Sequence, residues 1–297
     1  MTPSEPRVAI TGASGFVGSS LTERFERSGW SVVRFTRSAG EASELSVPFH
    51  LGDEVGEGVF RSRHVDALVH CAYDFRPVSW DDIRRVNVEG SRRLIAAAAA
   101  AGVPRMVVIS TISAFAGCRS LYGRAKLEIE AEAERFGAMV VRPGLVYGDL
   151  DSTGGGMIGS LRSSARGRLV PLLDGGGHLQ YLVHVDDLFE LVRRLCSGDL
   201  GPVKAPMVVA SPRGVTMREL VAELGRRQGT RPRFVSIPWQ AVWLGLKGAE
   251  ALGLKPSYRS DSVVSLVHQD PHPDFPSFAD LGVRVRDFGD AMSRTGE

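Results

Sequence analysis

Three glycines spaced three residues apart follow a short apolar run near the start of the chain, and this pattern restricts the fold most. Residues 7–10 have the composition of a buried strand, and the glycines are Gly12, Gly15 and Gly18. The first glycine permits a sharp turn, the second lets a pyrophosphate approach the backbone, and the third lets a helix pack on the strand. The N–H groups at the start of that helix favour phosphate. We therefore expect a dinucleotide site here.

Apolar runs alternate with helical patterns up to about residue 150. The expected strands are residues 7–10, 30–36, 67–70, 106–110 and 139–142, and helical patterns cover residues 87–101 and 122–135. This alternation predicts an α/β fold with a Rossmann-type, doubly wound parallel sheet. We expect residues 1–150 to form the dinucleotide-binding domain, residues 178–210 to return to it, and the remainder of residues 151–297 to form a smaller, mostly helical substrate lobe.

Charge and cysteine content exclude several classes of protein. The 297 residues carry a net charge of +2, which predicts no nucleic-acid partner. Cys71, Cys118 and Cys196 are odd in number and far apart, so neither a disulfide framework nor a metal site is expected. The beginning of the chain lacks the pattern of a signal peptide, and residues 237–254 are too short and too charged to span a membrane. A cytoplasmic protein without a membrane partner is predicted.

The end of the second expected strand indicates which dinucleotide binds. An acidic residue at this place accepts hydrogen bonds from the ribose of NAD, whereas an arginine accommodates the extra phosphate of NADP. Here Thr36 stands where the acid is expected, and Arg37 follows it. The sequence therefore favours NADP(H) over NAD(H). The alternative is that Arg34 and Arg37 are ordinary surface charges.

A tyrosine and a lysine four residues apart begin the helical pattern that follows the strand at residues 106–110. Tyr122 and Lys126 share one helix face, and a positive charge near a phenol lowers its pKa. A phenol tuned in this way can exchange a proton with an oxygen on a carbon that gains or loses hydride. The hydroxyls of residues 110–113 fall at the same edge of the sheet, where ligands of open α/β folds bind. Taken alone, the spacing also fits a purely structural pair.

Seven motifs in order resemble those of the extended short-chain dehydrogenase/reductases, the NAD-dependent epimerase/dehydratase family, over nearly the whole chain. The similar segments are residues 11–18, 52–53, 68–72, 87–91, 122–126, 142–148 and 184–187. The resemblance implies that Tyr122 is the general acid/base and that Lys126 lowers its pKa and holds the nicotinamide ribose. It assigns the catalytic hydroxyl to Thr111, with Ser113 as the alternative. The predicted cofactor-binding residues are Gly12, Ser14, Gly15, Phe16, Val17, Gly18, Thr36, Arg37, Asp53, Cys71, Ala72, Tyr73, Asn87, Lys126 and Pro143.

Three functions are compatible with these residues. The favoured one is an NADP(H)-dependent oxidoreductase that transfers hydride at a hydroxyl or carbonyl carbon of a small molecule. The alternative is a nucleotide-sugar epimerase or dehydratase with tightly bound NAD, although Gly144 stands where such enzymes often carry an asparagine that faces the diphosphate. A dinucleotide sensor without turnover is the third, and an intact Tyr122–Lys126 pair argues against it. The resemblance also suggests a homodimer through the helices that start near Asn87 and Tyr122.

Overall fold

A seven-stranded parallel sheet forms the centre of the protein. The computed structural model describes residues 5–37, 43–148, 155–200, 206–254, 256, 258–276 and 278–289. The strands lie in the order β3–β2–β1–β4–β5–β6–β11. Strands are therefore added toward one edge of the sheet from β1 to β3, and toward the other edge from β4 onward. Their bounds are β1 Arg7–Thr11, β2 Ser31–Thr36, β3 Ser46–Pro48, β4 Ala67–His70, β5 Arg105–Ile109, β6 Met139–Pro143 and β11 Met207–Val209. This confirms the predicted doubly wound Rossmann-type sheet.

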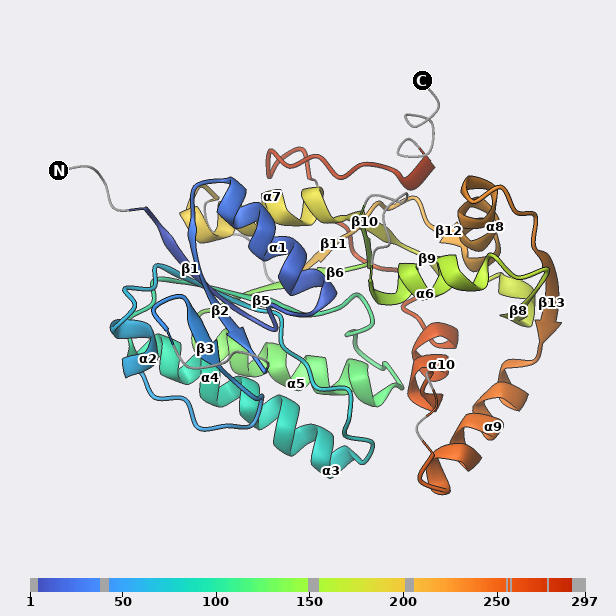
Figure 1. Cartoon of the computed structure of the whole chain (residues 1–297), viewed down its shortest axis with the longest axis horizontal. Coiled ribbons are helices and arrows are strands. Elements are labelled where there is room, and N and C mark those ends of the chain that lie inside the picture. Colours follow the sequence, from blue (N-terminus) through green and yellow to red (C-terminus); the bar gives the residue numbers. More distant parts are fainter. Residues whose placement is uncertain are drawn as a thin grey trace.

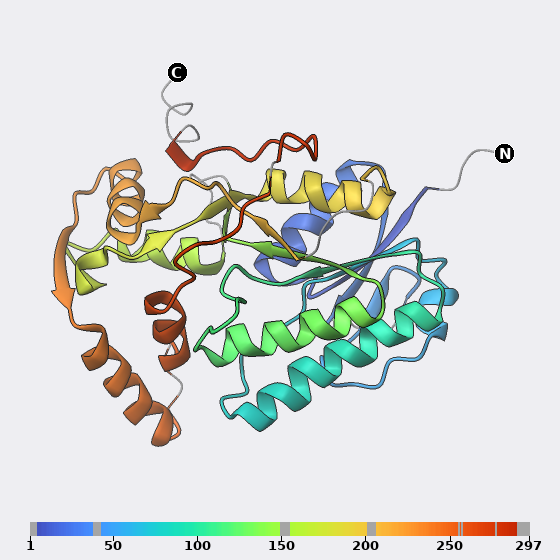
Figure 2. The ribbon, with the colours of Figure 1, turned by 180° about the vertical axis from the view of Figure 1, so that it is seen from behind.

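Helices cover both faces of the sheet (Figure 1). On one face lie α1 (Phe16–Arg27) and α7 (Val185–Ser197), and on the other lie α2 (Gly58–Arg61), α4 (Glu89–Ala100) and α5 (Leu121–Arg135). Figure 2, seen from behind, shows the same two layers. Each layer encloses its own apolar core, with Leu21 and Leu188 buried in the first and Leu94 and Ile129 in the second. Burial on both faces explains why the strands read as continuous apolar runs.

The helical pattern predicted to start at residue 87 begins earlier in the structure. Ser79 caps a short helix, α3 (Trp80–Ile83), and the chain continues through a π-helical turn, η1 (Arg84–Val88), into α4. A π-helical turn is a rare interruption that is frequently found at functional sites. Here the turn contains Asn87, which is fully buried.

A second, smaller lobe lies beside the sheet and combines helices with three pairs of short strands (Figure 1). Its helices are α6 (Gly156–Ser164), α8 (Met217–Arg227), α9 (Trp239–Ala251) and α10 (Ser260–Val267), together with the 3-10 turn η2 (Asp174–Gly176). The strand pairs are β7 (Leu145–Tyr147) with β10 (Leu182–His184), β8 (Leu169–Leu173) with β13 (Arg233–Ile237), and β9 (Leu179–Gln180) with β12 (Val215–Thr216). A capping box between Thr216 and Glu219 opens α8.

Ion pairs tie distant segments of the chain together. Asp187, at the start of α7, accepts hydrogen bonds from the backbone and the guanidinium of Arg286, which brings the last described segment against the body. Arg24 of α1 pairs with Asp186 at a distance of 2.6 Å. None of the helices in the described ranges is both long enough and apolar enough to cross a membrane.

Candidate active site

The glycine turn after β1 has the tight geometry that a dinucleotide site requires. Gly12 has a φ of +67°, and a Cβ there would lie 3.0 Å from the backbone of Ala72. A Cβ on Gly18 would lie 2.1 Å from the carbonyl oxygen of Gly12, so no other residue fits. Helix α1 follows Gly15, and in this described turn no side chain caps it and no acidic residue occupies its first turn. Uncapped N–H groups at a helix start suit the pyrophosphate of a dinucleotide.

A buried chain of hydrogen bonds holds the neighbouring strand ends in place. The hydroxyl of Thr11 lies 2.7 Å from Nδ1 of His70 and accepts hydrogen bonds from the backbone of Cys71 and Ala72. The other ring nitrogen of His70 lies 2.9 Å from the hydroxyl of Ser91. Burial, together with the nearby charge of Lys126, lowers the pKa of His70 to about 3, so the imidazole stays neutral. This network fixes the segment after β4 against the glycine turn.

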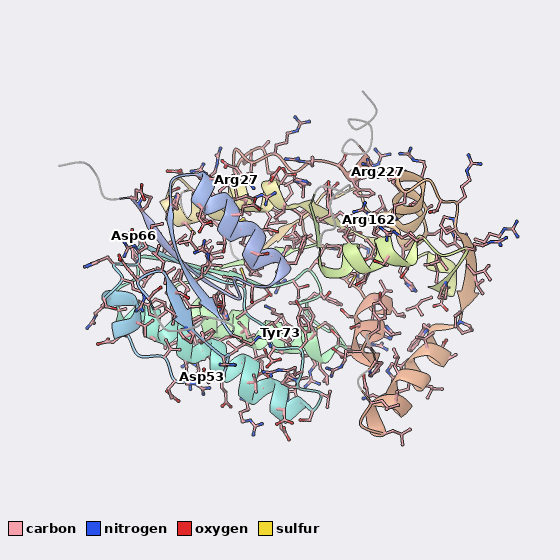
Figure 3. All side chains as sticks on the ribbon, viewed as in Figure 1. Arg27, Asp53, Asp66, Tyr73, Arg162 and Arg227 are labelled. Carbon is pink, nitrogen blue, oxygen red and sulfur yellow. The ribbon has the colours of Figure 1, made fainter. Side chains whose placement is uncertain are left out.

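Asn87 fixes the same segment from the other side. Its side-chain oxygen accepts a hydrogen bond of 2.7 Å from the backbone of Asp74, and its side-chain nitrogen donates one of 3.0 Å to the Asp74 carbonyl. Both groups are therefore engaged with the protein, and Asn87 shapes the site by holding residues 71–74. Cys71 and Tyr73 of that segment are partly exposed. Figure 3 shows Tyr73 toward the middle of the molecule.

The region expected to bind the ribose lies at the end of β2. Thr36 is partly buried, and its carbonyl accepts a hydrogen bond from the backbone of Phe49, while Arg37 is exposed. Asp74 lies close enough to Arg37 to feel its charge, although the hydrogen-bonded Arg76 contributes most to the lowered pKa of that carboxyl. Asp53 is labelled in Figure 3; its carboxylate is 56% exposed and accepts a hydrogen bond from the backbone of His50. A contact of Asp53 with adenine stays a prediction.

The structure brings Tyr122 together with Thr111. The Thr111 hydroxyl, which follows β5, lies near enough to the phenol at the start of α5 to lower the pKa of Tyr122. Ser113, the alternative hydroxyl, donates its backbone N–H to Thr111. Its carbonyl oxygen would lie 2.4 Å from a Cβ on Gly123, so the glycine next to Tyr122 lets α5 approach this loop. Pro143 is buried in β6, and its carbonyl accepts a hydrogen bond from the backbone of Ile112 beside Thr111.

Lys126 lies inside the protein, and its effect on Tyr122 differs from the expectation. Its ammonium donates a hydrogen bond of 2.8 Å to the carbonyl of Ile109 and lies 5.3 Å from the ring centre of Tyr73. Burial lowers the pKa of Lys126 to about 8. Burial also raises the pKa of Tyr122 to about 12, against the opposing effect of the Thr111 hydrogen bond. The predicted downward shift is therefore wrong for the protein alone, because burial of the phenol outweighs the effect of Thr111.

Two residues of the lobe complete the site, and no sequence motif predicted them. The carboxylate of Asp261, on α10, accepts hydrogen bonds from the backbone N–H groups of Leu121 and Tyr122, at 2.7 and 3.0 Å. Arg259 donates hydrogen bonds to the carbonyls of Phe75 and Pro77, at 2.6 and 3.2 Å. The lobe thus holds both the start of α5 and the segment that follows β4.

Aromatic rings surround Tyr122. Its ring centre lies 5.0 Å from that of Tyr73 in an edge-on arrangement, and 5.6 Å from that of Phe75. Tyr73 and Phe75 also contact one another, with 4.8 Å between ring centres. The phenol therefore has an apolar wall on one side and the Thr111 hydroxyl as a polar partner. Such a site suits proton transfer to an oxygen carried by an apolar molecule.

Gly144 occupies a position where no larger residue fits. A Cβ there would lie 2.1 Å from the carbonyl oxygen of Tyr181, and that carbonyl accepts a hydrogen bond from the backbone of Leu145. The sequence predicted that an asparagine facing a diphosphate is missing at this point. The structure supplies the reason, because the carbonyl of Tyr181, just before β10, leaves no room for a side chain.

Comparisons with known proteins agree with this geometry. The NAD dependent epimerase/dehydratase family matches residues 8–209. Ceramide reductase of Caulobacter vibrioides is 27% identical over 240 residues, covering 78% of this chain and 73% of that protein. A Stigmatella aurantiaca enzyme, 4-hydroxy-2-methyl-3-oxo-4-farnesyl-3,4-dihydroquinoline-1-oxide ketoreductase, is 26% identical over 266 residues, covering 80% and 77%. The UDP-glucose 4-epimerase of Thermotoga maritima superposes with a TM-score of 0.64 at 20% identity, covering 88% and 96%, which shows the shared fold alone.

Proposed function

The chain belongs to the NAD dependent epimerase/dehydratase family, and from this premise we propose that it is an NADP(H)-dependent oxidoreductase acting on a carbonyl or hydroxyl carbon of a small molecule. Tyr122 is the general acid/base. The observation that carries the proposal is the place of Tyr122 at the carboxyl edge of the sheet, beside the Thr111 hydroxyl and with its ring centre 5.0 Å from that of Tyr73. This edge is where ligands of doubly wound folds bind, and the glycine turn after β1 opens onto it.

Three residues of the chain have separate roles in the proposed reaction. A bound nicotinamide dinucleotide supplies or accepts the hydride. Tyr122 holds its proton at neutral pH, because burial raises its pKa to about 12, and donates it to the substrate oxygen during reduction. Thr111 orients the phenol and accepts or donates a hydrogen bond at the same oxygen. Lys126 places a positive charge under the site and would hold the nicotinamide ribose.

Arg37 supports the preference for NADP(H). It is exposed at the end of β2, and no acidic residue occupies position 36 or 37. A charged hydrogen bond to a phosphate is worth roughly 1.5–3 kcal/mol, or about 10- to 100-fold in affinity. We expect Arg37→Ala to weaken NADPH binding by this factor and to leave NADH binding nearly unchanged. Arg34→Ala is the matched control, because Arg34 lies on the same strand and pairs with Glu26. Equal losses of affinity for NADPH and NADH would contradict the assignment of Arg37 to the extra phosphate of NADP(H).

Reduction is favoured over chemistry on nucleotide sugars for two reasons. Gly144 leaves no room for a side chain facing a diphosphate. The two curated relatives described above are named as reductases, and each matches about four fifths of this chain. The likeness to epimerases rests on structures about one fifth identical in sequence, which share the fold.

The test is to denature the purified protein, identify any dinucleotide that it releases, and then titrate the apo protein with NADPH and NADH. A protein that is isolated empty and prefers NADPH supports a cofactor exchanged at each turnover. Tightly retained NAD would instead support an epimerase or dehydratase. Turnover with NADPH and a panel of carbonyl compounds, compared between wild type and Tyr122→Phe, then separates an enzyme from a dinucleotide sensor. Activity that survives undiminished in the variant would show that another group transfers the proton.

A further inference from the structure

Large apolar side chains are exposed on two segments that are far apart in the sequence. Phe75 and Val78, after β4, are 63% and 55% exposed. Leu252, Leu254 and Tyr258, between α9 and α10, are 80%, 61% and 50% exposed. Single exposed apolar residues are ordinary, but a group of them marks a binding surface. We call these five residues the apolar surface.

Arg259 joins the two segments. Its guanidinium donates hydrogen bonds to the carbonyls of Phe75 and Pro77, and Tyr258 precedes it directly in the chain. The end of the connection that leads into α10, at residues 258–259, therefore lies beside residues 75–77. Figures 1 and 2 both show the α9–α10 hairpin at the end of the molecule where α5 begins.

The apolar surface is continuous with the candidate active site. The ring centre of Phe75 lies 5.6 Å from that of Tyr122 and 4.8 Å from that of Tyr73. When the carbonyl oxygen of a bound molecule contacts the Tyr122 hydroxyl, the rest of that molecule would thus extend out of the site along Phe75. At this border the carboxylates of Asp74 and Glu250 both have partners, since Asp74 pairs with Arg76 and Glu250 accepts hydrogen bonds from Ser260.

Helix α9 extends the same apolar character. None of its residues is buried, and Leu244 is 62% exposed. Helices that bind anionic membranes carry many lysines and arginines on their polar face, whereas α9 carries Lys247 alone. The surface therefore lacks the charge of a membrane-binding helix, while its link to Tyr122 fits a substrate.

We propose that the apolar surface binds the hydrocarbon chain of the substrate, which is a carbonyl compound, or the corresponding alcohol, with a long alkyl or isoprenoid chain. This inference rests on the proposed function, since it takes Tyr122 as the group that meets the substrate oxygen. The chain lies over Phe75 and Val78 and reaches the α9–α10 connection. Burial of each methylene group then adds to affinity.

Calorimetric binding and turnover test the two proposals separately. A series of secondary alcohols from sec-butyl to sec-decyl is titrated into the NADP⁺-loaded protein, and the corresponding methyl ketones are offered with NADPH. Full burial of a methylene is worth about fourfold in affinity, so we expect about twofold per methylene on a surface that covers one side of the chain. Leu254→Ser and Val78→Ser should flatten this dependence and lower the ratio of decyl to butyl binding.

Leu169→Ser is the matched control. Leu169 is 65% exposed, similar to Leu254. It pairs with Arg233, the first residue of β13, whereas α9 follows the other end of that strand. It should leave the chain-length dependence intact. If affinity does not change with chain length, the apolar surface does not bind the substrate chain and the proposal is overturned. If the protein then adsorbs to phosphatidylcholine vesicles, the surface binds a membrane instead. If affinity depends clearly on chain length but no ketone is reduced, the result supports the proposed binding surface and refutes the proposed function.

Discussion

The carboxylate of Asp261 accepts a hydrogen bond of 3.0 Å from the backbone N–H of Tyr122, the proposed general acid/base. A second bond of 2.7 Å comes from Leu121. Asp261 belongs to α10 of the smaller lobe and Tyr122 to α5 beside the central sheet, so the two meet at the first turn of α5. A carboxylate at a helix start also suits the helix dipole. The position of the lobe thus determines the position of the phenol.

Substitution of Asp261 by asparagine should reduce turnover more than its effect on stability explains. The variant loses the charge and one of the two hydrogen bonds, at a cost of about 1–2 kcal/mol in the free energy of unfolding. A small displacement of Tyr122 lowers kcat by roughly tenfold or more, because proton transfer depends on geometry. NADPH affinity should be unchanged. Denaturant unfolding, cofactor titration and steady-state kinetics measure these three quantities.

The capping box of α8 provides the control for Asp261. Glu219→Gln weakens a hydrogen bond to the backbone of Thr216, at the start of a lobe helix. We expect a comparable loss of stability without a change in kcat. If Glu219→Gln and Asp261→Asn lowered kcat equally, Asp261 would act on overall stability and not on the position of Tyr122.

The two candidate hydroxyls differ in their expected contributions. Thr111 lies close enough to Tyr122 to lower the pKa of the phenol, whereas Ser113 contacts Thr111 through its backbone N–H. Thr111→Val should therefore lower kcat by about 100-fold or more, in the range of a lost acid/base or orienting group. Ser113→Ala keeps the backbone contact and should lower kcat by less than about threefold. The reverse order of effects would assign the catalytic hydroxyl to Ser113.

Local patterns predicted the sheet and the glycine turn because these depend on neighbouring residues. Gly12, Gly15 and Gly18 act within one strand–turn–helix, and their spacing can be read directly. The link from Asp261 to Tyr122 joins residues 139 positions apart, and no periodicity marks such a pair. The π-helical turn at Asn87 was missed because its residues also fit an ordinary helix. The direction of the Tyr122 pKa shift was missed because the burial of the phenol, which raises its pKa, is a tertiary property.

Gly144 should tolerate no side chain. A Cβ at this position would lie 2.1 Å from the carbonyl oxygen of Tyr181, so Gly144→Ala requires a shift of backbone in β7 or before β10. Overpacking of this kind costs about 1–3 kcal/mol in the free energy of unfolding, and asparagine should cost more. Gly148→Ala is the control, since its Cβ would meet only Val185, at 3.8 Å. Equal unfolding midpoints for the two alanine variants would contradict the close approach seen here.

Lys126 should make the stability of the protein depend on pH above neutrality. Its pKa is about 8 in the folded protein, below the ordinary 10.5, and its side chain is 3% exposed. Between these two values the unfolded chain binds a proton that the folded protein has released, so the contribution of Lys126 to stability rises with pH. Below pH 8 the buried charge carries its full cost. Lys126→Met removes this dependence.

The measurement is the difference in free energy of unfolding between wild type and Lys126→Met from pH 7 to pH 10. We expect a constant difference up to about pH 8, followed by a gain for wild type of about 1 kcal/mol per pH unit. Cys71 and Tyr122, whose pKa values burial raises to about 12, hold their protons longer in the folded protein. They lower stability at high pH in both proteins, so their effect largely cancels in the difference. A difference that stays constant across the whole range would mean that the folded protein does not lower the pKa of Lys126.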